Sequence, residues 1–130
     1  MTTELYVLAL AALLQALQFF AYSATSIAQV GPDKAAGPRD TAIILTGTAG
    51  RLQRALNNHF EGLILFTIAV VVITLGDRGT GFSAGCAWVY LVARILYVPA
   101  YLFGLAPWRS VIWFVGFLST MLMILSALIA

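Results

Sequence analysis

Charged residues are scarce in this 130-residue sequence, and cysteine and histidine occur only once each. Only 9% of the residues are charged, against about 25% in a typical soluble domain. In contrast, 62% are hydrophobic, against about 45–50% in such a domain. So few charges cannot cover so much apolar surface in water. The sequence therefore predicts an integral membrane protein, and its length allows a single domain, residues 1–130.

The same shortages exclude several kinds of site. Cys86 is the only cysteine, so an intramolecular disulfide and a cysteine-based metal site are excluded, and its apolar surroundings favour a packing role. No serine–histidine–aspartate arrangement accompanies the single histidine, His59, and the sequence offers too few ligands for a metal site. A net charge of +2 without a basic run gives no sign of a nucleic-acid partner.

Four apolar stretches are long enough to cross a membrane, since about 20 helical residues span its hydrocarbon core. We expect these spans at residues 4–27, 41–75, 82–103 and 108–130, which predicts an all-α, four-helix membrane bundle. The second would be the longest helix, roughly 50 Å if helical throughout. Its amphipathic first half would then project from the membrane. Glycines leave its start open between Thr41 and Gly50, and Asp40 could cap it.

The basic residues gather on one side of this arrangement. The first and third loops face the same side, and most basic residues lie in or next to them: Lys34, Arg39, Arg51, Arg54 and Arg109. The opposite side carries only Arg78. The positive-inside rule then places the two loops in the cytoplasm and both termini on the other side.

A polar stripe enters the second apolar stretch. Its residues are spaced three, four and three apart: Arg51, Arg54, Asn58 and Glu61. A helix places them on one face, whereas His59 falls about 100° away and is expected to face an interface or lipid headgroups. The alternative for His59 is a catalytic role, since histidine is the usual proton carrier near neutral pH. Ionisable groups at membrane depth cost about 2.5–3.5 kcal/mol each and usually face a bundle interior or a wet cavity. The stripe is either a structural network or a binding site for a small anionic or zwitterionic ligand.

The third and fourth stretches bring a second polar set to the same end: Arg94, Tyr97, Tyr101, Arg109 and Ser110. Arginine forks bind carboxylates, and tyrosines donate hydrogen bonds or stack. Glu61 is the only carboxylate expected at depth, and it could hold an ammonium group. Such a set suits a small peptide that carries carboxylates at its ends and an amine.

Together these motifs resemble those of the MAPEG family, the membrane-associated proteins of eicosanoid and glutathione metabolism. Arg51-x-x-Arg54-Ala55-x-x-Asn58-x-x-Glu61 is similar to the family signature. Arg94-x-x-Tyr97-x-x-x-Tyr101, followed by Pro107-x-Arg109-Ser110, is similar to the family's second segment. The resemblance covers nearly the whole chain. It implies a homotrimer that binds glutathione between subunits near the cytoplasmic face.

The resemblance also implies individual roles. It assigns glutathione contacts to six residues: Arg54, Asn58, Glu61, Arg94, Tyr97 and Tyr101. We expect Arg51, on the same stripe as Arg54, to bind glutathione as well. Arg109 matches the arginine proposed to activate the thiol in leukotriene C synthase. Arg109 and Ser110 together match an Arg-Ser pair of microsomal prostaglandin E synthase. Three differences stand out. The first span has no arginine, Trp113 replaces a tyrosine of the prostaglandin synthase, and Asn57 occupies a position that is often basic in that enzyme class.

Two functions follow from this resemblance. The first is a glutathione-dependent transferase or peroxidase acting on lipophilic electrophiles that partition into the membrane. The alternative is a non-catalytic membrane protein of the same fold that binds lipid or a small anionic ligand. A transporter is disfavoured because no pair of spans shows an inverted repeat with broken helices. The short chain is typical of a bacterial member, so we expect it in a bacterial inner membrane.

Overall fold

The computed structural model describes residues 1–37 and 45–129 of the chain. These residues form four long helices and one short one: α1 (Thr3–Val30), α2 (Pro32–Ala36), α3 (Gly47–Leu75), α4 (Gly81–Leu102) and α5 (Trp108–Ile129). Each long helix is apolar and long enough to cross a membrane. The prediction of an all-α protein with four membrane-spanning helices is therefore confirmed.

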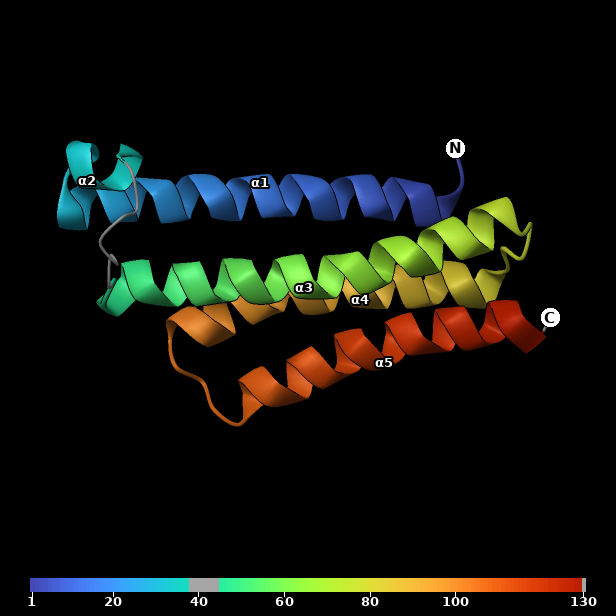
Figure 1. Ribbon diagram of the computed structural model, residues 1–130. Helices are drawn as coiled ribbons and strands as arrows, with labels where there is room; N and C mark the ends of the chain where they lie inside the picture. Colours follow the sequence, from blue (N-terminus) through green and yellow to red (C-terminus); the bar gives the residue numbers. More distant parts are fainter. Residues whose placement is uncertain (38–44, 130) are drawn as a thin grey trace.

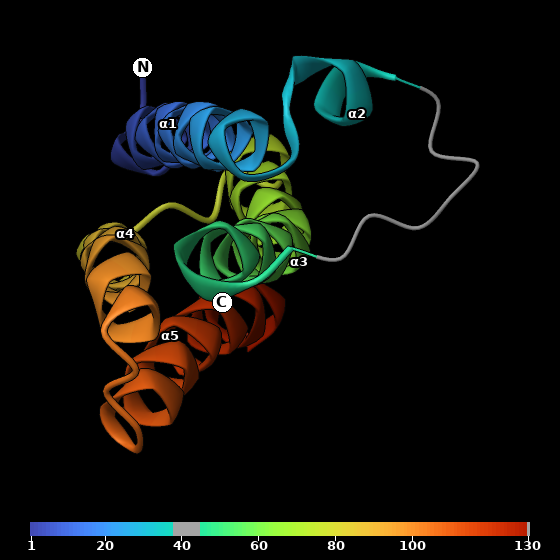
Figure 2. The same cartoon turned by 90° about the vertical axis from the view of Figure 1, so that its left-hand side faces the viewer.

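The four long helices run alternately in opposite directions (Figure 1). Both termini lie at one end of the bundle, and the connection after α1 and the α4–α5 loop lie at the other. Viewed from that loop end, α1 and α5 lie apart, with α3 and α4 between them (Figure 2). α1 packs on α3 and α4, and α5 packs on the same two helices. Within the described residues α1 and α5 do not touch.

Small residues take part in the contacts between these helices. Ala11, Ala69 and Ala87 are fully buried, and they allow the helix backbones to approach closely. Tyr90 of α4 stacks on Phe66 of α3 with ring centroids 4.0 Å apart. Close packing matters here because lipid tails are as apolar as the side chains, so association depends on van der Waals contact. Cys86 is buried in the same core, which confirms its predicted packing role.

The start of α3 is tied to the end of α1. Gln29 accepts a hydrogen bond from the Thr46 N–H and donates one to the Thr46 carbonyl, both at 2.9 Å. α3 begins at Gly47, inside the predicted range, and its 29 residues measure about 43 Å at 1.5 Å per residue. Asp40, the predicted cap, and Arg39 lie outside the described residues. Thr46 holds the cap position of α3.

The short helix α2 lies in a segment where the prolines and glycines predicted only a loop. Pro32 occupies its first helical position. A proline fits there because the missing N–H would have no helical partner and the fixed φ already suits a helix. The composition of the loop therefore did not exclude one helical turn.

A buried carboxylate connects α1 and α4, the two helices that begin at the end of the bundle where both termini lie (Figure 1). Glu4 is 4% exposed, and its Oε1 accepts a hydrogen bond of 2.6 Å from the Ser83 hydroxyl. Ser83 belongs to a capping box with Thr80 at the start of α4, where the helix dipole favours negative charge. Glu61, in contrast, is exposed. The burial of Glu4 was not predicted from the sequence.

Replacing Ser83 with alanine is expected to destabilise the protein by about 1.5–3 kcal/mol, because a buried charged acceptor loses its donor. Thermal unfolding in detergent measures the change. Ser110→Ala is the matched control, since Ser110 is exposed and its loss should stay within about 0.5 kcal/mol. Equal losses in the two variants would contradict a structural role for the Glu4–Ser83 bond.

Candidate functional site

Two arginines from different helices meet at the ring of Tyr101. Arg54 of α3 donates from Nε to the Tyr101 hydroxyl at 2.8 Å. Arg109 of α5 places its Cζ 4.7 Å from the centroid of the same ring. Tyr101 stands in the last turns of α4, so three helices contribute to this cluster. The fold thus joins the first predicted motif to the second.

Arg51 lies beside this cluster and contacts the end of α4. It is exposed, and its Nη1 donates to the Leu102 carbonyl. The last carbonyls of a helix lack helical partners and carry partial negative charge. Arg51 therefore closes the C-terminal end of α4, which is a structural role beside the ligand contact predicted for it.

Deeper in the bundle, Arg94 joins the two polar faces. It is 3% exposed, and its Nη1 donates to Asn58 Oδ1 at 2.8 Å. Its guanidinium also lies over the ring of Tyr97, with Cζ 4.6 Å from the centroid. Arg94 and Tyr97 belong to α4, and Asn58 belongs to α3. The predicted stripe on α3 thus faces the predicted polar set on α4.

His59 is fully buried, so the expectation that it faces an interface or headgroups is wrong. Its Nδ1 accepts from Arg94 Nε at 3.4 Å, which leaves the ring proton on Nε2. Nε2 lies 3.0 Å from the Ala11 carbonyl of α1 and donates to it. His59 is buried because α1 covers this side of α3, and Ala11 is small enough to admit the ring.

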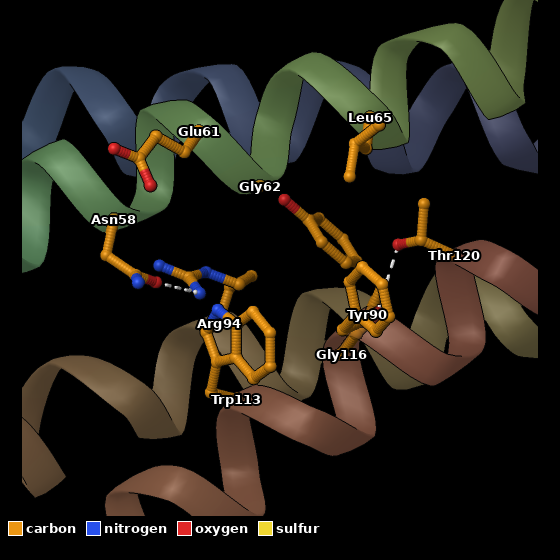
Figure 3. A pocket seen from close by; sticks show the side chains of 10 residues that line it. Asn58, Glu61, Gly62, Leu65, Tyr90, Arg94, Trp113, Gly116 and Thr120 are labelled. Atoms are coloured by element: carbon orange, nitrogen blue, oxygen red, sulfur yellow. Dashed lines mark hydrogen bonds between the residues drawn. The ribbon is translucent and has the colours of Figure 1, made fainter.

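A cavity of about 180 Å³ opens beside Arg94, between α3, α4 and α5 (Figure 3). Glu61 and Gly62 line it from α3, Tyr90 from α4, and Trp113 from α5. The Tyr90 hydroxyl points toward Gly62 (Figure 3). Two buried atoms at this cavity, Arg94 Nη2 and Tyr90 Oη, have no hydrogen-bond partner within the described residues. Two buried donors without partners therefore lie beside this cavity.

The site carries an excess of positive charge. Within the described part of the chain, four arginines contact hydroxyl, amide, carbonyl, imidazole or aromatic groups and no carboxylate: Arg51, Arg54, Arg94 and Arg109. Glu61 forms no ion pair or hydrogen bond there either. Arg94 is buried and Arg109 is half-buried, and cations in such positions without acidic partners are costly. Guanidinium groups bind carboxylates well. The arrangement thus suits an anionic or zwitterionic ligand.

One predicted residue stays apart, and some lining residues were not predicted. Ser110 is exposed, and its hydroxyl makes no hydrogen bond within the described residues. Tyr90 and Trp113 line the cavity without having been predicted. The spacing held a signal for both. Tyr90 precedes Arg94 by four residues and Trp113 follows Arg109 by four, so each pair shares a helix face.

Comparison with known proteins agrees with the sequence motifs. The model of the MAPEG family matches residues 3–129, which include the four long helices and every predicted site residue. No curated protein and no solved structure is significantly similar to the chain. The chain therefore belongs to the MAPEG family, whose members include glutathione transferases and related membrane proteins.

Proposed function

We propose that the protein is a membrane-bound, glutathione-dependent transferase or peroxidase that acts on lipophilic electrophiles. The observation that carries this proposal is the arginine group without acidic partners in the described chain: Arg54, Arg94 and Arg109. Glutathione brings two carboxylates, which guanidinium groups bind in a bidentate manner. Its ammonium group suits the exposed carboxylate of Glu61.

The thiol of glutathione would be activated at Arg109 and Tyr101. A cation beside a thiol favours the thiolate, and so does a hydrogen bond to the sulfur. The Tyr101 hydroxyl accepts from Arg54, so its own proton remains available to the sulfur. Arg109 lies against the same ring. These contacts support a thiolate held where α4 ends and α5 begins.

Lipophilic substrates would reach this thiolate from the bilayer. The first turns of α5 expose large apolar side chains next to Arg109: Trp108, Val111 and Phe114. An apolar surface beside a charged site lets a membrane-dissolved molecule approach without crossing water. This arrangement supports an electrophile that is lipophilic.

A second candidate is a non-catalytic protein that binds anionic lipid headgroups. The exposure of Arg51 and Arg54 at one end of the bundle favours it, because arginines near a membrane surface attract such headgroups. This candidate requires no thiol chemistry.

Isothermal titration calorimetry with reduced glutathione separates the two candidates. The proposed enzyme is expected to give a saturable signal at millimolar glutathione or below, since several charge-assisted bonds form. The detergent-solubilised protein is titrated in parallel with vesicles that contain anionic lipid. Heat from the vesicles and none from glutathione would reject the enzyme and support the headgroup-binding protein.

We also propose that three copies of the chain assemble with the ligand between subunits. Large apolar side chains of α1 remain exposed in the single chain, among them Leu13, Leu17 and Phe20. Native mass spectrometry in mild detergent is expected to give three times the 14.0 kDa mass of the chain. A spectrum of monomer alone would remove the trimer.

Replacing Arg54 and replacing Arg109 are expected to have different effects on binding and turnover. Arg54→Ala should mainly weaken glutathione binding, by about 1.5–3 kcal/mol for a lost charge-assisted bond. Arg109→Ala should lower turnover more than binding, because its contact strengthens as the thiolate forms and reacts. Calorimetry measures the binding, and initial rates measure the turnover.

The thiolate itself provides the control. Its ultraviolet absorbance on glutathione binding is expected to persist in Arg54→Ala at saturating glutathione and to disappear in Arg109→Ala. Suppose instead that Arg109→Ala keeps this absorbance and its turnover, while both variants lose assembly alike. The arginines would then only hold subunits together, and the thiolate role of Arg109 would be wrong.

A further inference from the structure

A second cavity, of about 500 Å³, lies where α3 ends and α4 begins. This is the end of the bundle opposite the arginines of the candidate site (Figure 1). Carboxylates, hydroxyls and backbone line the cavity, among them those of Glu4, Asp77, Thr2, Thr80 and Gly81. None of the residues that line it belongs to the candidate site. The cavity is therefore a separate feature, which the proposed function does not use.

Glu4 carries a charge in this cavity that no cation balances. It is 4% exposed and forms no ion pair within the described residues. Its Oε1 accepts from the Ser83 hydroxyl at 2.6 Å, whereas its Oε2 has no hydrogen-bond partner in that part of the chain. The same Ser83 oxygen lies 2.9 Å from the Thr80 carbonyl, so two acceptors share one proton. The start of α4 adds about half a positive charge, which balances Glu4 only in part. A buried carboxylate of this kind gains from a cation.

The unbonded oxygen of Glu4 is open to the cavity. The Thr74 hydroxyl oxygen is enclosed without a partner, but Glu4 Oε2 is not among the enclosed atoms of the described chain. Gly79 and Gly81 line the same cavity and carry no side chain that could cover it. A Cβ at Gly79 would lie 3.7 Å from Glu4 Oε1, and a Cβ at Gly81 would meet no atom within 4 Å. A small donor can therefore reach the carboxylate.

The lining favours an organic ammonium group over a metal ion. No group of three His, Cys, Asp or Glu side chains comes together as metal ligands in the described residues. Two carboxylates are present, that of Glu4 inside the cavity and that of Asp77, which is exposed. A primary ammonium has three N–H donors, and carboxylates accept strong, charge-assisted hydrogen bonds from it. A group of this size also uses more of the cavity than a single ion.

The start of α4 supplies donors for an anionic group beside the ammonium. The first N–H groups of a helix lack helical acceptors and attract phosphate. Those of Gly81 and Phe82 have no acceptor within the described residues. Thr2 and Thr80 each accept a backbone N–H at the side-chain oxygen, so their hydroxyl protons remain available. The cavity thus offers acceptors for a cation and donors for an anion.

The position of the cavity favours a lipid over a soluble zwitterion. α3 and α4 are both long and apolar enough to cross a membrane, and the cavity lies between the end of the one and the start of the other. Lipid headgroups occupy this boundary. Leu75 and Phe82 adjoin lining residues in the sequence and are 83% and 54% exposed. Acyl chains of a lipid whose headgroup fills the cavity would pack on these side chains.

We propose that this cavity binds the headgroup of phosphatidylethanolamine, a lipid that carries a primary ammonium next to a phosphate. Glu4 and Asp77 accept hydrogen bonds from the ammonium, and Thr2, Thr80 and the first N–H groups of α4 donate to the phosphate. The lipid then connects α1 with the turn between α3 and α4. This inference concerns the other end of the bundle and does not depend on glutathione.

Native mass spectrometry of the detergent-solubilised protein tests the inference. The protein is titrated with three dioleoyl lipids that differ only in the headgroup: phosphatidylethanolamine, phosphatidylcholine and phosphatidylglycerol. The choline group has no N–H donor, and the glycerol group has no cation. We expect the dissociation constant of the ethanolamine lipid to be lower than those of the other two on the order of 10-fold, because only it forms charge-assisted bonds to the carboxylates.

Three variants locate the site. Glu4→Gln keeps an oxygen for Ser83 and removes the charge, so it should abolish the preference for the ethanolamine lipid without changing the affinity for the choline lipid. Asp77→Asn decides the question if Glu4→Gln fails to fold, which circular dichroism would reveal. Asparagine tolerates the φ of 53° at this position, and the variant should reduce the preference. Asp33→Asn removes an exposed carboxylate at the other end and should leave the preference unchanged.

Several results would overturn the inference. One is equal affinity of the unaltered protein for the ethanolamine and choline lipids, and another is a preference that survives in the folded Glu4 and Asp77 variants. Tightest binding of phosphatidylglycerol would show that the start of α4 recognises phosphate without the carboxylates. Displacement of the lipid by an equal concentration of soluble phosphoethanolamine would reject a lipid as the occupant. None of these results bears on glutathione binding, which calorimetry measures separately.

Discussion

The burial of the Arg94 guanidinium constrains how the helices pack. A charge inside an apolar bundle is tolerated only where hydrogen bonds replace its lost water. Asn58 and His59 of α3 accept from Arg94, and Tyr97 of α4 lies under its guanidinium plane. His59 extends this network to the Ala11 carbonyl of α1. Three helices must therefore keep one register for Arg94 to keep these contacts, and small residues such as Ala11 allow that close approach.

The contacts that stabilise the fold differ from those at the ring of Tyr101. The contacts of Arg94 are internal, whereas Arg54 and Arg109 place two positive groups around one ring, that of Tyr101. The Cζ atoms of Arg54 and Arg109 lie 5.7 Å and 4.7 Å from the centroid of this ring, and like charges repel each other. Local arrangements that work against stability tend to occur at functional sites. The presence of two cations at one ring favours an anionic ligand near Tyr101 over a purely structural network.

The sequence predicted those features that one helix determines alone. The spacing of Arg54, Asn58 and Glu61 places them on one face whatever surrounds the helix, and the structure turns that face toward α4 and α5. The burial of His59 was not predictable in this way, since it depends on α1 covering the adjacent face. The burial of Glu4 depends likewise on Ser83, which lies 79 residues after Glu4 in the sequence. Tertiary contact, and not local pattern, decided both positions.

The exposure of the side chains decreases along the site, and this decrease affects how strongly the site binds charge. Arg54 is exposed at the loop end, Arg109 is partly buried, and Arg94 and Tyr90 are almost fully enclosed. Electrostatic interactions strengthen as the surroundings become less polar. A charged ligand would therefore be held best at the exposed end, where its carboxylates keep part of their hydration.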